Sequence, residues 1–451
     1  MRPMSSTPPL TRDQLLARFH AYGQPRERWR IGGEFERQAL RPDGSPVGFF
    51  EPHGIQEILE ALAARTDWRE IREDEHLIGL CGKSVPDGPG PCLTLEPGGQ
   101  VELSGSPHRS MLALRDEFMG FQADLLAVAQ DRPLRWVACG YSPLADVEDI
   151  SWVPKSRYEV MRAYLPQHGD LAHHMMKATC AVQVNYDYAD EADCARKVQA
   201  VARIAPLVTA MFANSPLRQG RETGFQSYRA HIWTRTDPDR CGIPQWLVDH
   251  YSHERWLTYL LQVPMMFVRI NGHHRPAHGM DFGTYMDQGV EGHFPTMDDW
   301  ELHQTSVFPE LRVKRTFEVR GIDCVSPPLA IAACALYTGL LYDDQALDDV
   351  IELGAELSSH GSAAELLDRA ARNGLEAVAG RSFASWCEDL VTQAQAGLER
   401  HEPAALPLLE PAVALVASGR SPARELQRRW REDPRPEALI DWISLDEASL
   451  G

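Results

Sequence analysis

The chain has 451 residues, of which 43% are hydrophobic and 24% are charged. This composition is typical of a globular protein with a sizeable core and excludes a collagen-like or disordered chain. Its formal net charge of -19 at pH 7 would repel a phosphate backbone, which excludes nucleic acid as an expected partner.

The N-terminus and the cysteines set an expectation for the cellular location. Residues 1–10 have no apolar core behind their one arginine, so we expect no signal peptide, and no apolar stretch reaches the length of a membrane span. The nine cysteines are dispersed, without a CxxC pair, which favours free, non-catalytic thiols over a disulfide framework or a zinc site. These observations predict a cytoplasmic protein with no membrane partner.

The first elements along the chain are predicted to be helical. Residues 1–28 are expected to form a flexible start with a short helix over 12–22. A second helix should open at Gly54, because apolar residues at helical spacing follow it: Ile55, Ile58, Leu59 and Leu62. The Gly- and Pro-rich residues 82–90 then predict a surface loop.

Longer helices are expected further along. Residues 109–130 predict one helix, and Asp190 is placed to cap another, in which apolar residues recur every three or four positions. Pro206 should kink or break that helix, because proline lacks the amide hydrogen and clashes with the preceding turn. After Pro328 the Ala-rich chain is expected to be mainly helical to its end.

Two predicted strands carry polar residues mostly on one face. Along residues 179–188, strict alternation puts one set on a single face: Thr179, Ala181, Gln183, Asn185 and Asp187. Along residues 311–320 the same argument groups Arg312, Lys314, Thr316, Glu318 and Arg320. The opposite faces of both strands are mainly apolar.

Carboxylates recur on further strand segments. Glu34 and Glu36 share a face of residues 31–37. Polar sets also flank the turn at residues 97–99, with Thr94 and Glu96 before it and Gln100, Glu102 and Ser104 after it. The Gly–Gly pair in this turn would let the two flanking strands approach closely.

Two interpretations of these polar faces stay open on the pattern alone. In an ordinary one-sided antiparallel sheet, such a face meets water and forms surface salt bridges. Here, however, separated segments supply carboxylates together with arginine and lysine. Mg²⁺ prefers carboxylate oxygens completed by phosphate and water, and phosphates prefer arginine and lysine. A sheet presenting both sets on one concave face would form the floor of a metal–nucleotide site.

In these segments the chain resembles the plant and proteobacterial type of glutamate–cysteine ligase, within the carboxylate–amine ligase group related to glutamine synthetase. The matching blocks lie in family order over residues 30–345, and LEPGGQVELSG alone would nearly suffice. They are GGEFE at 32–36, LTLEPGGQVELSGSP at 93–107, TCAVQVNYDY at 179–188, FANSP at 212–216, SYRAHIW at 227–233, TDP at 236–238 and FPELRVKRTFEVRGID at 308–323.

The resemblance implies a fold and a division of the chain. The fold is α+β, with a curved, mostly antiparallel sheet forming a funnel-shaped active site and helices packed outside, as in glutamine synthetase. Residues 29–345 would be the catalytic core, preceded by an N-terminal segment over 1–28. Residues 346–451 would form a helical region packed on the core, in a monomer or homodimer.

The resemblance also implies a reaction with L-glutamate, L-cysteine and ATP as substrates and Mg²⁺ as the metal. ATP would phosphorylate the γ-carboxylate of glutamate, and the cysteine amine would then displace phosphate. The product would be γ-glutamylcysteine, in the first step of glutathione biosynthesis. Positioning and charge neutralisation by metals, arginine and lysine would supply the catalysis, with no protein nucleophile required.

Site residues follow from the resemblance and the strand faces together. The expected metal ligands are Glu34, Glu36, Glu96, Glu102 and Glu318. Arg312, Lys314 and Arg320 are expected to act on the phosphates and the acyl phosphate, with a solvated charged strand as the alternative. Gln183 and Asn185, with Lys314, would bind the cofactor; structural hydrogen bonding is an equally open role for the two amides.

The glutamate pocket is expected at Arg229, Trp233 and Thr179, because the planar fork of arginine grips a carboxylate through two hydrogen bonds. One departure from the family concerns Ala178, where an arginine is common. If that arginine binds substrate, Lys177, His174 or another residue would have to compensate.

The histidine pairs at 173–174 and 273–274 would point apart, which predicts surface positions and not a transition-metal site.

Three other functions remain open at this point. A ligase of the same fold could use a different amine acceptor, since acceptor choice depends on pocket shape. A non-catalytic nucleotide-binding relative would be marked by lost carboxylates, and all five are present. A glycosidase with paired carboxylates would need neither the cationic strand nor ATP.

Overall fold

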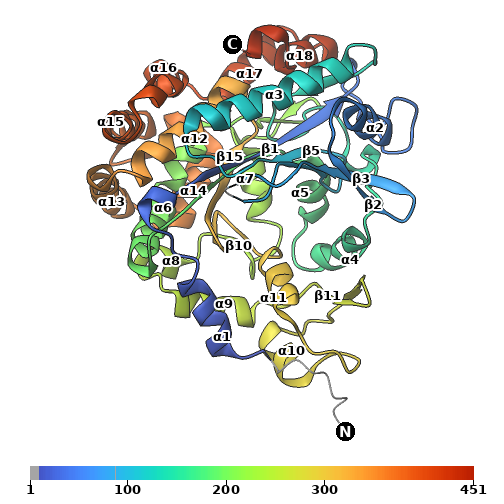
Figure 1. Cartoon of the computed structure of the whole chain (residues 1–451). Helices are drawn as coiled ribbons and strands as arrows, with labels where there is room; N and C mark the ends of the chain where they lie inside the picture. The colour runs from blue at the N-terminus through green and yellow to red at the C-terminus, as the bar shows by residue number, and fades with distance from the viewer. Residues whose placement is uncertain (1–9, 87, 451) are drawn as a thin grey trace.

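An antiparallel sheet lies at the centre of the computed structural model, which describes residues 10–86 and 88–450 (Figure 1). Within these residues nine strands form the sheet in the order β14-β15-β7-β1-β5-β4-β3-β2, with β6 paired to β1. The strands are β1 (Ile31–Leu40), β2 (Arg69–Glu73), β3 (His76–Cys81), β4 (Cys92–Leu95), β5 (Val101–Ser104), β6 (Arg135–Val137), β7 (Ala181–Tyr186), β14 (Leu311–Val313) and β15 (Phe317–Asp323).

Helices cover both sides of this sheet. In Figure 1, α3 runs across the upper side and α4 and α5 lie below it. The helices of the first two thirds of the chain are α1 (Arg12–His20), α2 (Ile55–Arg65), α3 (Met111–Ala129), α4 (Ser156–Tyr164), α5 (Ala172–Ala178), α6 (Glu191–Met211), α7 (Tyr228–Trp233), α8 (Gln245–Asp249), α9 (His253–Gln262), α10 (Phe282–Gln288) and α11 (Met297–Gln304).

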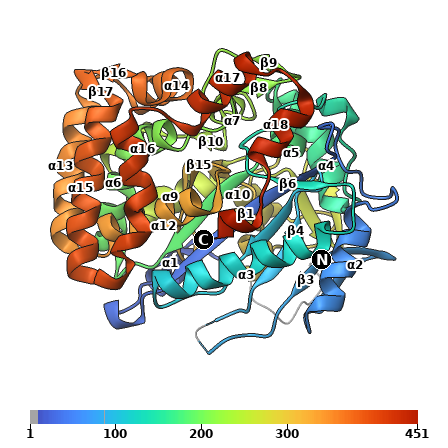
Figure 2. The same ribbon diagram turned by 90° about the horizontal axis from the view of Figure 1, so that it is seen from above.

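The rest of the chain is mainly helical, as expected after Pro328. Figure 2 shows α12, α13, α15 and α16 gathered on one side of the molecule, opposite α2. Here α13 and α14 pack on α6, and α15 packs on α12. The helices are α12 (Pro327–Leu341), α13 (Asp344–Ser358), α14 (Ala363–Asn373), α15 (Phe383–His401), α16 (Glu410–Ser418), α17 (Pro422–Glu432) and α18 (Pro436–Ile443). The division of the chain at residues 28 and 345 stays a prediction.

Short strand pairs complete the described secondary structure: β8 (Leu217–Arg218) with β9 (Arg221–Glu222), β10 (Cys241–Gly242) with β13 (Phe308–Pro309), β11 (Phe267–Ile270) with β12 (His273–Pro276), and β16 (Val378–Ala379) with β17 (Arg381–Ser382). No helix among the described residues has the length and apolar character needed to cross a membrane.

The core lies between the apolar face of the sheet and the helices α3 and α12. Phe35 of β1 stacks on Phe118 of α3 with 3.9 Å between ring centroids, and the hydroxyl of Tyr186 in β7 donates to the Cys334 carbonyl of α12 at 2.7 Å. Because side chains alternate along a strand, Glu34 and Glu36 must then face the other way. The packing of one side therefore fixes the polar side.

Several predicted helices are confirmed, and of the kink or break expected at Pro206 the break does not occur. The helices expected at Gly54 and over 109–130 are α2 and α3, and Asp190 caps α6 by accepting the Asp193 amide at 2.9 Å. Pro206 does not break α6, which runs on to Met211. A proline removes only one helical amide, and the flanking turns are held in place by burial against α13 and α14.

The single strand expected over 311–320 is also wrong. The chain turns back on itself, with the Lys314 amide donating to the Thr316 carbonyl at 2.8 Å. In the resulting hairpin of β14 and β15, Arg312 lies opposite Glu318. Arg312 therefore meets Glu318 across a hairpin and not along one strand.

One pair of cysteines contradicts the expectation of free thiols. Cys81 ends β3, Cys92 begins β4, and the register makes them direct partners, so their side chains meet and form a disulfide. The loop expected over 82–90 connects them, and residue 87 lies outside the described residues. The other cysteines are free: Cys139, Cys180, Cys194, Cys241, Cys324, Cys334 and Cys387.

This pairing predicts which thiols react. Protein purified without reductant, then unfolded and alkylated, should carry label on every cysteine except Cys81 and Cys92, and reduction should expose both. The double variant Cys81→Ser/Cys92→Ser should lose about 2–3 kcal/mol of unfolding free energy, because the unfolded chain loses a cross-link over a short loop. Peptide mass spectrometry and urea denaturation measure these effects; alkylation of all nine cysteines without reduction would contradict the pairing.

Candidate active site

The sheet register brings the predicted carboxylates onto one face. Residues directly opposite each other in an antiparallel pair point to the same side. Three such pairs link the four central strands: Glu36 with Glu102, Glu34 with Gln183, and Asn185 with Glu318. The side of the sheet away from α3 is therefore strongly acidic at its centre.

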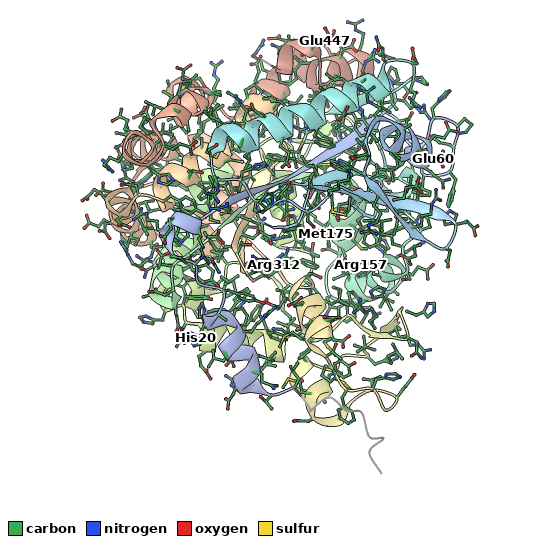
Figure 3. The ribbon with its side chains drawn as sticks, viewed as in Figure 1. His20, Glu60, Arg157, Met175, Arg312 and Glu447 are labelled. Atoms are coloured by element: carbon green, nitrogen blue, oxygen red, sulfur yellow. A yellow bond between two sulfur atoms is a disulfide. The ribbon has the colours of Figure 1, made fainter. Side chains whose placement is uncertain are left out.

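This face opens into a cavity of about 200 Å³. Figure 3 shows three of its lining residues, Arg312, Met175 and Arg157, together on the side of the sheet opposite α3. Most of the predicted site residues line it: Glu34, Glu36, Glu96, Glu102, Thr179, Gln183, Trp233, Arg312 and Arg320. The other four, Asn185, Arg229, Lys314 and Glu318, do not.

Glu318 is fully buried and surrounded by cations. Arg312 grips it through both carboxylate oxygens, with its Nη2 at 2.9 Å, and Lys314 Nζ lies 2.9 Å away. Arg320 completes the ring with a direct ion pair. Burial by itself would raise the pKa of Glu318, but these three cations hold it well below its usual range. Glu318 thus orients the cationic side chains that the sequence assigned to the phosphates.

The other carboxylates are crowded and lack such partners. Burial, with repulsion from Glu96, raises the pKa of Glu36 to about 8. Burial also raises the pKa of Glu34, with Glu318 adding to the shift. It lifts the pKa of Glu102 well above its usual range, and Glu96 is the strongest of the neighbours that add to it. Each ionised carboxylate penalises ionisation of the next, so a positive charge brought to this face would favour the ionised forms.

The two predicted amides bridge the acidic and basic groups. Gln183 donates to Glu36 at 3.3 Å and accepts from Arg320 at 2.6 Å. Asn185 donates to Glu34 at 2.8 Å and accepts from the Thr316 hydroxyl at 2.9 Å. Both amides thus make structural hydrogen bonds, as the alternative interpretation of Gln183 and Asn185 predicted. Their binding of a cofactor stays a prediction.

The expected glutamate residues lie at one end of the cavity. Trp233 contributes to its wall, and its indole N–H has no hydrogen-bond partner among the described residues. Arg229 lies behind it, 3% exposed, with its guanidinium 5.9 Å from the Trp233 ring centroid. The Arg229 charge lowers the pKa of Glu36 against the effect of burial, so the guanidinium acts on the cavity from its wall.

A second pocket of about 450 Å³ adjoins the far end of the same face. Asn185, Thr316 and Gly32 form the boundary with the acidic centre, and Pro86, Pro89 and Pro107 supply apolar wall. Its most distinctive lining is cationic: Arg28, Arg30, Arg109 and Arg315. Asp187 also lines the pocket, but in a chain with a net charge of -19 the four arginines give this pocket a local excess of positive charge.

Sequence reasoning missed the wall opposite the sheet. It consists of Arg157, Tyr158 and Met161 from α4, with Met175 and Met176 from α5. The Nε of Arg157 is buried without a hydrogen-bond partner among the described residues. The available signal was an adjacent pair of methionines directly before the 179–188 block.

The residues proposed around Ala178 do not reach the cavity. Lys177 is buried, with its Nζ 5.1 Å from the centroid of the Trp152 ring. His174 is buried against the Tyr141 hydroxyl at 2.7 Å, so the surface position expected for it is wrong. The two histidines point apart, as expected for adjacent positions on a helix. His173 contacts the Arg162 carbonyl at 3.0 Å.

The carboxylate face suits a metal ion that is shared between the protein and a phosphate. It does not form a complete coordination shell by itself. Among the described residues, one group of metal-ligating side chains has all its ligand atoms within 4.8 Å, namely His168, Asp237 and Asp239. None of them lines the cavity, and Asp237 already pairs with Arg240 at 2.6 Å. The cavity glutamates are more widely spaced. Mg²⁺ characteristically takes a few carboxylates and completes its shell with phosphate oxygens and water.

Comparisons with known proteins agree with this chemistry. The family model described as glutamate-cysteine ligase family 2 (GCS2) matches residues 30–440. The chloroplastic glutamate–cysteine ligase of Brassica juncea is 36% identical over 432 residues, covering 93% of this chain and 81% of that protein. Chloroplastic ligase B of Oryza sativa subsp. japonica is 35% identical over 442 residues, covering 95% and 87%.

Solved structures share the fold at low identity. The glutamate–cysteine ligase of Francisella tularensis, in complex with AMP, superposes with a TM-score of 0.53 at 13% identity, covering 94% of this chain and 91% of that one. A bifunctional glutathione synthetase from Pasteurella multocida gives 0.51 at 14% identity, covering 96% and 52%. The α+β class with a mainly antiparallel sheet and helices packed outside is thus confirmed.

The comparisons also correct one expectation. The related plant ligases are chloroplastic, which contradicts the cytoplasmic location expected from the sequence. That prediction rested on the missing signal peptide and dispersed cysteines, and neither feature distinguishes the cytoplasm from a plastid.

The pKa of Glu36 predicts how stability depends on pH. An unfolded glutamate titrates near 4.3 and Glu36 at about 8, so between these values the folded state holds the extra proton. Without metal, the free energy of unfolding should therefore fall as pH rises through this window. The contribution of Glu36 to this fall is up to about 1.4 kcal/mol per pH unit.

Urea denaturation of the wild type and Glu36→Gln from pH 5 to 9 measures this effect. The wild type should lose stability relative to the variant as pH rises, and added Mg²⁺ should reduce the loss by stabilising the ionised carboxylate. Parallel pH profiles of the two proteins would contradict the assignment.

Proposed function

The chain belongs to glutamate-cysteine ligase family 2 and is an ATP-dependent ligase, and we propose that its cavity joins L-glutamate to L-cysteine. The product is γ-glutamylcysteine, the first intermediate of glutathione biosynthesis. The observation that carries the proposal is the meeting, in one cavity, of the carboxylates Glu34, Glu36, Glu96 and Glu102 with Arg312 and Arg320. A glycosidase has no use for those cations, and a non-catalytic relative has no need to keep every carboxylate.

The reaction needs activation because a carboxylate is a poor acyl donor. The γ-phosphoryl group of ATP passes to a γ-carboxylate oxygen of glutamate, and ADP leaves. The neutral amine of cysteine then attacks the acyl carbon, its surplus proton passes to a base, and inorganic phosphate departs with the C–O bond electrons. Both steps depend on positioning and on neutralising phosphate charge.

The acidic face is the proposed metal site. Glu34, Glu36, Glu96 and Glu102 would hold divalent cations, for which Mg²⁺ is the natural choice, since it favours carboxylates and phosphate oxygens. Bound there, the ions would neutralise phosphate charge and align the phosphoryl group with its acceptor. Glu318, already neutralised by its three cations, would contribute mainly by holding them in place.

Arg312 and Arg320 are the proposed phosphoryl-stabilising residues, since both line the cavity. Their guanidinium groups are fixed in advance by Glu318, so they need little reorganisation when charge develops. Lys314 is held by Glu318 at the same place without lining the cavity. Lys314 would add positive charge to the cavity from behind the residues that line it.

The substrates are proposed to occupy different ends of the site. ATP would enter by the arginine-lined pocket and extend its phosphates past Asn185 towards the glutamates. The α-carboxylate of glutamate would bind near Arg229 and Trp233, with Thr179 alongside. Cysteine would lie against the wall of Met161, Met175 and Met176, because thioethers suit a small polarisable thiol group.

The decisive experiment is ADP release measured with ATP and Mg²⁺, with and without each amino acid. Release should require glutamate, and γ-glutamylcysteine should form only when cysteine is added. Mass spectrometry of the product, with α-aminobutyrate as a competing acceptor, then identifies the preferred amine. A preference for another amine would retain the ligase and overturn the assignment of cysteine.

At the glutamate end, Arg229→Lys should raise the KM for glutamate at least about tenfold, because a charge-assisted hydrogen bond is worth about 1.5–3 kcal/mol and lysine lacks the bidentate fork. The KM for ATP should stay close to the wild-type value. Steady-state kinetics with each substrate varied in turn measures both. A shift confined to ATP would place Arg229 in the nucleotide site.

At the opposite end, Arg315→Ala should raise the KM for ATP several-fold and leave that for glutamate nearly unchanged. Arg315 is an exposed arginine at the rim of the second pocket, so its loss removes phosphate attraction with little effect on packing. Arg255→Ala, an exposed arginine on α9 that lines neither pocket, is the matched control. Equal effects of the two variants would mean that only the overall charge matters.

A further inference from the structure

A buried carboxylate without an assigned role lies behind the glutamate end of the cavity. Asp323 ends β15 and is 2% exposed. Its Oδ2 accepts the Asn214 amide at 2.8 Å and the Ser215 hydroxyl at 2.7 Å, and its Oδ1 accepts the Ser227 hydroxyl at 2.9 Å. Arg229 Nη1 lies 3.9 Å from the same Oδ1. Of these partners, Ser227 and Arg229 lie at the start of α7, and Ser215 bonds to the Arg229 backbone.

Two of these partners hold the backbone of α7. Ser227 caps the helix, since its hydroxyl accepts the Ala230 amide at 3.1 Å. The Ser215 hydroxyl accepts the Arg229 amide at 3.0 Å, and the Ser215 carbonyl accepts the Tyr228 amide at 3.0 Å. Because α7 spans only Tyr228–Trp233, its first turn depends on these outside acceptors. Asp323 orients both serine hydroxyls by accepting their hydrogens.

The Arg229 side chain is fixed at two points of its guanidinium. Nη2 donates to the Arg320 carbonyl at 2.9 Å, and Nη1 faces Asp323. Nε has no hydrogen-bond partner among the described residues. Other carboxylates near Arg229, Glu36 and Glu310, influence it only through space. Among the described residues, Asp323 is the carboxylate that both pairs with the Arg229 guanidinium and accepts hydrogen bonds from the serines that hold the α7 backbone.

We propose that Asp323 is the positioning residue of the glutamate site. It holds both the first turn of α7 and the guanidinium of Arg229 in place. Glutamate bound by its α-carboxylate is thereby aligned with the γ-phosphate of ATP. This inference rests on the proposed function. Asp323 does not line the cavity and acts through the Arg229 side chain and the turn of α7 that carries it. Its removal should therefore weaken glutamate binding without affecting the nucleotide.

The test compares Asp323→Asn with the wild type in glutamate-dependent ADP release. The amide keeps the shape of the side chain but loses the charge and replaces one of the two accepting oxygens with an NH₂ donor, which would face the donors bonded at that position. The KM for glutamate should rise on the order of tenfold, and the KM for ATP should stay close to the wild-type value. Ser215→Ala, which removes one link and no charge, should shift the same constant less.

A double-mutant cycle with Arg229→Lys distinguishes positioning from general support of the fold. If Asp323 acts through Arg229, the double variant should bind glutamate no more weakly than Arg229→Lys alone. Asp193→Asn is the matched control. Asp193 anchors the buried Lys197 at 2.9 Å and accepts the Ala189 amide at 2.8 Å, away from both pockets. It should lower the melting temperature and leave the KM for glutamate unchanged.

Two outcomes would overturn the proposal: an unchanged KM for glutamate in Asp323→Asn, or effects that simply add in the cycle. If Asp323→Asn fails to fold, the same cycle run with Ser215→Ala decides the question. Wild-type protein that releases no ADP in response to glutamate would overturn the proposed function together with this inference. Glutamate-dependent release in the wild type with an unchanged KM in the variants would overturn the inference alone.

Discussion

Negative charge confined to one small buried face is the constraint on which the rest of the structure depends. Glu34, Glu36, Glu96 and Glu102 line a cavity of about 200 Å³. Their mutual repulsion and loss of water would drive the face apart or keep it protonated. The β14–β15 hairpin meets this constraint by placing Arg312, Lys314 and Arg320 around Glu318 beside it. The amides of Gln183 and Asn185 then join the acidic and basic groups by hydrogen bonds.

In the proposed mechanism, the same balance would separate the functions of the two ends of the site. The cations nearest the glutamates are already paired with Glu318, so they are ordered before any ligand arrives. The arginines of the second pocket lie on the far side of Asn185, close enough to attract an anion into the acidic centre. An acidic protein can in this way accept a highly charged nucleotide, because the attraction is local.

Strand alternation was the part of the fold most readable from sequence. It placed Glu34, Glu36, Gln183 and Asn185 on one face. Because successive side chains alternate, burial of Phe35 and Val184 on the other side puts their neighbours on this face. The hairpin at 314–316 was missed, because Lys-Arg-Thr contains none of the glycine, asparagine or proline that signals a turn. The Cys81–Cys92 disulfide arises from strand register, and the wall of Arg157 and the methionines arises from helix packing. The adjacent methionines were a local signal, but the sequence does not say which surface they face. Asp323 stood inside a matched block, but its partners come from two other segments of the chain.

The pairing of β1 has a consequence for how the chain can vary. This strand is bonded to β5, β6 and β7, and Phe35 lies between the two glutamates against Phe118. Inserting or deleting one residue within Ile31–Leu40 would exchange the two faces, sending the carboxylates into the apolar core and the phenylalanine into the cavity. A change of length within β1 would thus destroy the core and the cavity together, so this strand tolerates substitution only.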